Sequence, residues 1–144
     1  KYKRKKAKKY LMTVTLRRPS ARYICQAYYD KAPDRINNLR PDTLAMMLSL
    51  ANVAAGGKVL VLDACMGLVN AAVVERMGGL GDLCATTLDH LVPLDAAKSL
   101  NLTAAQTSTI CQAPLATLLR FRAEAEAAAA AEVAAAAEAA AAAA

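Results

Sequence analysis

The sequence contains no tryptophan, one phenylalanine and one histidine among its 144 residues. The four cysteines, Cys25, Cys65, Cys84 and Cys111, are separated by 40, 19 and 27 residues and form no Cys-x-x-Cys pair. These spacings exclude the usual zinc-binding motifs. Scattered cysteines without a secretory signal favour a reducing compartment. His90 has no catalytic companion, so we interpret it as a loop histidine.

The chain also lacks a long apolar run, apart from an alanine-rich tract over residues 123–144. A membrane helix needs about 18 consecutive apolar residues. The tract holds 17 alanines, and its glutamates argue against membrane insertion. Alanine is the best helix former, so we expect a low-complexity helix or linker there and no membrane partner. Because the sequence has no initiator methionine and ends within this tract, we expect it to be a fragment.

Negative charge is scarce in the first part of the chain. Residues 1–40 hold 13 Lys and Arg against Asp30 and Asp34, whereas residues 41–144 hold 5 Lys and Arg against 10 Asp and Glu. The net charge of +6 is therefore concentrated at the N-terminal end. Such an uneven distribution indicates a surface for a polyanion.

The densest basic run is Lys1–Lys9, with seven positive charges, which we expect to be extended or loosely ordered until it binds. Phosphate is the expected counter-charge, and Tyr2 and Tyr10 could stack on an unpaired base or simply pack. The run could equally be a nuclear-localisation signal or a solvated arm. The residues that we predict to bind RNA are Lys3, Arg4, Lys5, Lys6, Lys8, Lys9, Arg17, Arg18, Arg22, Arg35 and Arg40.

The pattern up to residue 51 predicts one strand and two helices. Tyr10–Leu16 is rich in strand formers and predicts an edge strand. A helix follows over residues 21–29, and Pro33 ends it. A second helix is expected to be capped by Asp42 or Thr43. Its apolar positions follow the spacing of a buried stripe, namely Leu44, Met47, Leu48 and Ala51.

The central segment predicts a strand, a helix and a second strand. Val59–Leu62 is an apolar run typical of a strand covered on both faces. Leu68–Met77 reads as a helix that ends at Gly78 and Gly79, and Asp82–Leu88 as the second strand. Two parallel strands joined by a crossover helix are the first half of a doubly wound sheet. The predicted class is α/β, a partial Rossmann-like domain with a basic N-terminal arm and an alanine-rich low-complexity tail.

No third strand is evident from the sequence. We divide the chain into a basic arm with an edge strand over residues 1–16, the start of a degenerate Rossmann-like domain over 17–90, a variable insertion over 91–122 and the alanine-rich tract over 123–144. A short helix over Leu115–Phe121 is expected to run into that tract.

The loop after Val59–Leu62 resembles the cofactor loop of class I methyltransferases, in which an acidic residue is followed by alternate glycines. Here those positions are Asp63, Cys65, Gly67 and Val69, so one glycine is kept and two are lost. A branched side chain at Val69 would occupy space that a ligand beside the backbone needs. Asp63 could simply accept hydrogen bonds from loop N–H groups. Asp89, 22 residues after Gly67, stands near the position of a ribose-binding acid or is a turn residue.

Three segments carry a more specific resemblance. RINNLRPDTLAMML at 35–48, NVAAG at 52–56 and CMGLVNAAVVERMGG at 65–79 resemble the non-catalytic subunit of the eukaryotic tRNA (adenine-58-N1)-methyltransferase, the Gcd10 family. Lys1–Lys9 is also similar to that family's linker into its methyltransferase-like domain. The resemblance covers roughly residues 1–83.

The resemblance implies a heterodimer, or a pair of heterodimers, with a catalytic methyltransferase subunit of the same fold. That partner would bind S-adenosylmethionine and methylate N1 of adenine 58, while this chain would bind tRNA, hold no cofactor or metal and contribute no catalytic residue. The implied location is nuclear. Three alternatives remain open: an active S-adenosylmethionine-dependent RNA methyltransferase, a basic nucleic-acid-binding module without a methyltransferase link, and a scaffold whose arm only directs nuclear import.

Overall fold

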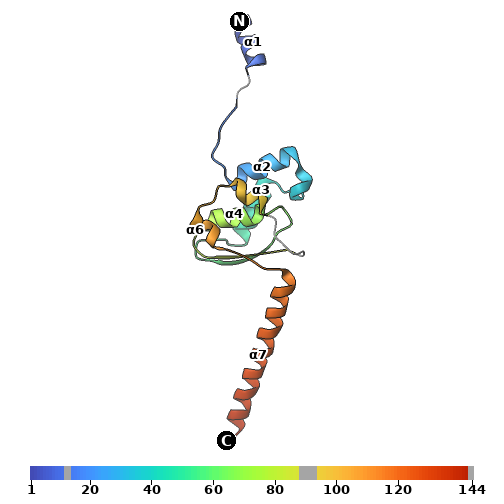
Figure 1. Ribbon diagram of the computed structural model, residues 1–144, viewed down its shortest axis with the longest axis vertical. Coiled ribbons are helices and arrows are strands. Elements are labelled where there is room, and N and C mark those ends of the chain that lie inside the picture. The colour runs from blue at the N-terminus through green and yellow to red at the C-terminus, as the bar shows by residue number, and fades with distance from the viewer. Residues whose placement is uncertain (12–13, 88–93, 143–144) are drawn as a thin grey trace.

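The computed structural model describes residues 1–11, 14–87 and 94–142 as a small α/β body with a helix projecting at each end (Figure 1). The elements, in chain order, are α1 (Tyr2–Tyr10), α2 (Ala21–Lys31), the 3-10 helix η1 (Pro33–Ile36), α3 (Pro41–Leu50), β1 (Lys58–Leu62), α4 (Leu68–Met77), β2 (Asp82–Thr86), α5 (Asp95–Ser99), α6 (Ala104–Ser108), β3 (Ile110–Gln112) and α7 (Leu115–Ala142). The predicted α/β class is confirmed, since the chain combines helices with a β-sheet.

The sheet is parallel and has the order β1-β2-β3. In its register Leu60 pairs with Cys84, and Cys84 pairs with Cys111. Helix α4 connects β1 to β2, and β2 is followed by α5 and α6 before β3. Consecutive parallel strands joined by helices are the arrangement expected for part of a doubly wound sheet.

The helices cover one face of this sheet. Figure 1 shows α2, α3, α4 and α6 stacked on the same side of the strands. On the other face Leu60 and Leu62 are 63% and 56% exposed. The prediction that Val59–Leu62 is covered on both faces is therefore wrong, because an apolar run alone does not reveal how many layers pack on a strand.

Helix α4 is the centre of the core. Its buried residues are Leu68, Asn70, Ala71, Ala72, Val73, Val74 and Met77. One end packs with Cys25, Ile36 and Leu44, and the other with Val53 and Leu83. The predicted bounds of this helix are confirmed, since Gly78 ends it with φ of 69°. Gly81 has φ of 110°, and a Cβ there would collide with the backbone of Gly57, so only glycine fits this turn.

The N-terminal arm differs from its prediction. Tyr2–Tyr10 is a helix instead of an extended segment, and no strand forms at Leu11 or residues 14–16, the described part of Tyr10–Leu16. The lysine- and arginine-rich run consists of good helix formers. Among the described residues, no strand pairs with Leu11 or residues 14–16, and strand preference depends on such pairing.

Helix α2 is confirmed, with Ser20 as its N-cap. Helix α3 starts at Pro41 with Arg40 at the N-cap, so the predicted caps at Asp42 or Thr43 are wrong. Proline suits the first helical position because it has no N–H to satisfy. The predicted stripe on α3 is only partly buried, since Leu44 is 2% exposed whereas Met47 is 42% exposed.

The third strand was not predicted. Ile110–Gln112 pairs with Leu83–Ala85 and attaches the segment 94–114 to the sheet. The helix predicted to start at Leu115 and continue into the alanine tract is confirmed as α7. Asp89, His90 and the end of the predicted strand at Leu88 lie outside the described residues. Within the described ranges, no helix is long and apolar enough to cross a membrane.

Candidate nucleic-acid interface

The loop after β1 is organised around the buried carboxylate of Asp63, which is 3% exposed. Its Oδ1 atom accepts a hydrogen bond from the backbone N–H of Cys65 at 2.6 Å. Its Oδ2 atom accepts from the N–H groups of Val69 and Asn70 at 3.1 and 3.2 Å. These last two donors belong to the first turn of α4, where the helix dipole favours a negative charge. The carboxylate therefore ties the loop to the helix.

The side chains that replace the two missing glycines are used for packing. The Cys65 thiol donates to the carbonyl oxygen of Ile36 at 3.4 Å, and Asn37 Nδ2 lies 3.9 Å from Cys65 Sγ. Burial, followed by the nearby Asp63 charge, raises the pKa of the Cys65 thiol. Val69 is half-buried against the core, and Gly67 caps α4 with φ of 79°. Both non-glycine residues thus contact the chain's own segments.

Helix α5 also touches this loop. The backbone N–H of Ala96 donates to the carbonyl oxygen of Met66 at 3.2 Å, and Ala96 is fully buried. The loop is consequently held from two sides, by η1 and its following turn and by α5. Within the described ranges, no group of three or more His, Cys, Asp or Glu residues could hold a metal ion.

The predicted RNA-binding residues of the arm lie on α1, where all of them are exposed: Lys3, Arg4, Lys5, Lys6, Lys8 and Lys9. Tyr2, Lys6 and Tyr10 follow one another at four-residue spacing on the same helical face. The ammonium of Lys6 lies 5.6 Å from the Tyr2 ring centre and 5.3 Å from the Tyr10 ring centre. Such cation–π contacts stabilise an exposed helix modestly, by about 0.5–1 kcal/mol. The two tyrosines thus frame the basic surface of α1.

The arginines before α2 have different surroundings. Arg17 Nη1 donates to the Tyr23 hydroxyl at 3.0 Å, and its guanidinium lies 4.9 Å from the Tyr23 ring centre. Within the described part of the chain, Arg18 makes no ion pair, and the same holds for Arg22. Arg17 is therefore held against α2, whereas the other two guanidinium groups keep their hydrogen-bond donors available.

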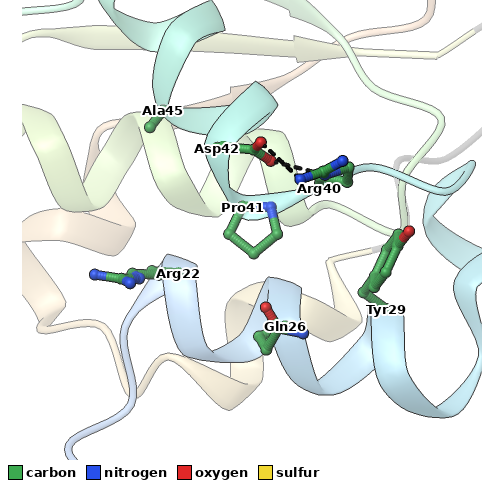
Figure 2. Close-up of a pocket in the computed structure, with 7 residues that line it drawn as sticks. All are labelled: Arg22, Gln26, Tyr29, Arg40, Pro41, Asp42 and Ala45. Carbon is green, nitrogen blue, oxygen red and sulfur yellow. Dashed lines mark hydrogen bonds and ion pairs between the residues drawn. The ribbon is translucent and has the colours of Figure 1, made fainter.

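Arg22 and Arg40 line one groove between α2 and the start of α3, at its opposite ends (Figure 2). The groove has a volume of about 750 Å³, and its lining residues are Arg22, Gln26, Tyr29, Arg40, Pro41, Asp42 and Ala45. The two arginines were predicted from the sequence, but Gln26 and Tyr29 were not. The i, i+4, i+7 spacing of Arg22, Gln26 and Tyr29 was the available signal, since these positions share a helical face.

Arg35 lies at a separate pocket of about 430 Å³ on another side of α2, where Ile24, Tyr28 and Lys31 also contribute. The loop arginines Arg35 and Arg40 therefore do not share one site, although the sequence placed them on either side of the same short segment. Arg35 belongs to η1, whereas Arg40 follows Asn37 and Asn38, whose φ angles of 50° and 56° turn the chain between the two arginines.

These features define a class of protein. It is an α/β chain with a basic N-terminal helix and a glycine-poor loop after its first strand. The chain belongs to the Gcd10p family, whose model matches residues 1–143.

The curated relatives share one name. The chain is 49% identical over 83 residues to the mouse "tRNA (adenine(58)-N(1))-methyltransferase non-catalytic subunit TRM6", covering 58% of this chain and 17% of the mouse protein. The protein of that name from Dictyostelium discoideum is 41% identical over 83 residues, 58% of this chain and 16% of its own length. The protein of that name from Schizosaccharomyces pombe is 30% identical over 90 residues, which are 62% of this chain and 19% of the S. pombe protein. The chain thus spans less than a fifth of the length of these relatives.

Proposed function

We propose that this chain is the tRNA-binding part of a non-catalytic subunit of the tRNA N1-methyladenosine-58 methyltransferase complex. It holds the tRNA by phosphate contacts and positions adenine 58 for a catalytic subunit of the same fold, in a heterodimer or heterotetramer. The observation that carries the proposal is the exposed basic helix α1 in a member of the Gcd10p family. Nuclear localisation is part of the same proposal.

The α/β body is proposed to be a degenerate Rossmann-like domain of the class I methyltransferase type. The parallel order β1-β2-β3 and the helical crossovers support this assignment. The three backbone N–H groups on Asp63 and the packing of Cys65 and Val69 support a purely structural role for the loop. We therefore assign S-adenosylmethionine to the partner subunit and no cofactor to this chain. Calorimetry with S-adenosylmethionine tests this, and micromolar binding by this chain contradicts it.

Helix α1 has a specific physical reason to need a polyanion. A nine-residue helix is marginal in water, and like charges at i, i+4 destabilise it further. Lys1 and Lys5, Arg4 and Lys8, and Lys5 and Lys9 are such pairs. Phosphate groups remove this repulsion, so tRNA should increase the helical circular dichroism of a peptide comprising residues 1–11, whereas sodium chloride at equal ionic strength should increase it less.

The direct test reverses charge in the arm. A Lys5→Glu, Lys6→Glu variant should bind tRNA much more weakly, and the slope of log K against log salt should shrink by about 0.7–0.9 for each phosphate that the arm no longer binds. The matched control is Lys58→Glu, Lys98→Glu, which makes the same charge change outside the arm. Equal affinities of the two variants would contradict the proposed role of α1.

A further inference from the structure

The groove between α2 and α3 combines three kinds of side chain along one stripe of α2. Arg22, Gln26 and Tyr29 present a guanidinium, an amide and a phenol ring over about 10 Å of helix. Figure 2 shows Arg22 at one end of the groove, Tyr29 and Arg40 at the other, and Gln26 between them facing Pro41. A length of this order accommodates one nucleotide and an adjacent phosphate.

The two arginines of the groove differ in their hydrogen-bond partners. Arg40 is held by Asp42 through two contacts, Nε to Oδ1 at 3.1 Å and Nη2 to Oδ2 at 3.0 Å. Desolvation raises the pKa of the Asp42 carboxyl, but the N–H groups of Thr43 and Asp42 and the Arg40 guanidinium outweigh it, so the net pKa lies below its usual range. Arg40 is therefore already paired within the chain, in an exposed ion pair. The Arg22 side chain has no hydrogen bond or ion pair with any described residue, so its guanidinium donors are available to a phosphate.

The remaining two side chains suit a nucleobase. Gln26 Nε2 donates to Asp30 Oδ1 at 2.8 Å, which orients the amide and leaves its carbonyl oxygen as an acceptor. Tyr29 is 36% exposed, and a solvent-accessible aromatic ring is a stacking surface for an unpaired base. A base inside a duplex has both faces covered, so this ring can act only on an unstacked one.

We infer that this groove binds a single unpaired nucleotide of RNA, with the base on Tyr29 and a neighbouring phosphate on Arg22. The inference rests on the proposed tRNA-binding function and adds a base-contacting site to the phosphate contacts of the arm. Arg17 and Arg18 lie just before Pro19 and Ser20, which lead into α2, so basic residues continue along the chain from the groove toward the N-terminal arm. That continuity of positive charge favours a nucleic-acid strand over a protein side chain as the occupant.

The experiment uses the 144-residue chain and a fluorescently labelled single-stranded uridine decamer, with affinity measured by anisotropy over a series of salt concentrations. Tyr29→Ala should weaken binding about tenfold without changing the salt slope, because stacking releases no counterions. Tyr29→Phe should retain wild-type affinity because it keeps the ring. Arg22→Ala should reduce the magnitude of the slope by about 0.7, as expected when one phosphate of a single strand is no longer bound. Phe121→Ala removes an exposed ring on α7 and serves as the control that should bind like the wild type.

A decamer of abasic ribose phosphates separates a base contact from an indirect effect. The wild type and Tyr29→Ala should bind the abasic strand equally, because no base is left to stack. A tenfold difference that persists on the abasic strand would overturn the inference, as would wild-type affinity of Tyr29→Ala for the uridine strand. If the lysine variants of the arm lose binding while Tyr29→Ala and Arg22→Ala do not, the groove is refuted and the arm is retained. If neither set has an effect, both the groove and the tRNA-binding proposal fail.

Discussion

The carboxylate of Glu75 lies 2.7 Å from the backbone nitrogen of Ala21 and accepts its hydrogen bond across 54 residues of sequence. Ala21 is the first residue of α2, and its N–H is one of the donors that a helix leaves unsatisfied at its start. Helix α4 thereby fixes the point from which Arg22 projects. The central helix of the core thus positions one end of the proposed nucleotide groove.

We expect Glu75→Ala to lower the free energy of unfolding by about 1–2 kcal/mol, because it removes an anionic cap from a helix N-terminus. Glu75→Gln keeps an acceptor oxygen but loses the charge, so its effect should be about half as large. Urea denaturation followed by circular dichroism measures both values. Equal stability of all three proteins would show that this contact does not hold α2 in solution.

Asp63→Asn tests the structural role of the loop carboxylate. The replacement leaves one acceptor oxygen for three backbone N–H groups, so we expect a loss of about 2–3 kcal/mol of unfolding free energy. Asp82→Asn is the matched control, since Asp82 is exposed on β2 and should change stability by less than about 0.5 kcal/mol. A stability loss no larger than that of the control would show that these three hydrogen bonds do not hold the loop in solution.

The sequence predicted those elements whose signals are local. The apolar run at Val59–Leu62 and the terminating Gly78 place β1 and α4 correctly, because run length and glycine act within a few residues. Strand β3 gives no such signal. It has three residues, two of them exposed, and it is defined by pairing with Leu83–Ala85, far away in the sequence. The strand predicted at Tyr10–Leu16 was wrong although its local signal was present, since no strand pairs with the described residues there.

The candidate site shows the same division. Charge alone identified Arg22 and Arg40 as candidates one by one, but their place along the same groove depends on how α2 packs beside α3. Residue type also suggested correctly that Asp63 could accept loop N–H groups. Residue type could not show that Asp42 would pair with Arg40 and leave Arg22 unpaired, because in the sequence the two arginines are equivalent cations.

Thr86→Val should stabilise the protein. Thr86 is 1% exposed, and its Oγ1 atom has no hydrogen-bond partner among the described residues. A buried hydroxyl without a partner costs about 1–3 kcal/mol, so removing it in a residue of nearly the same shape should raise the free energy of unfolding by about 1 kcal/mol. Thr107→Val is the control, because the Thr107 hydroxyl donates to Thr103 O at 3.0 Å and its loss should bring no gain. A destabilised Thr86→Val protein would mean that the hydroxyl is hydrogen-bonded in solution.

The cysteines should differ in reactivity. Burial, with smaller effects of Cys65 and Asp42, raises the pKa of the Cys25 thiol from 9.0 to about 11, and this thiol donates to the Leu39 carbonyl oxygen at 3.3 Å. Cys111 is exposed on β3. At pH 8, iodoacetamide should therefore modify Cys111 within minutes and Cys25 only after denaturation, because the thiolate is the reacting form and the buried group must first be uncovered. Mass spectrometry of tryptic peptides reads out both sites.

The same pKa shift predicts a pH dependence of stability. Below pH 9 the thiol of Cys25 is protonated in both the folded and the unfolded chain, so its contribution is fully present. Between pH 9 and about 11 only the unfolded chain ionises, and the free energy of unfolding should fall by about 1.4 kcal/mol per pH unit on account of this group. Lysines and the other thiols also titrate in this range, so the quantity to measure is the difference between the wild type and Cys25→Ala. That difference should shrink by about 2 kcal/mol from pH 9 to pH 11, and a constant difference would show that Cys25 is not the buried thiol responsible.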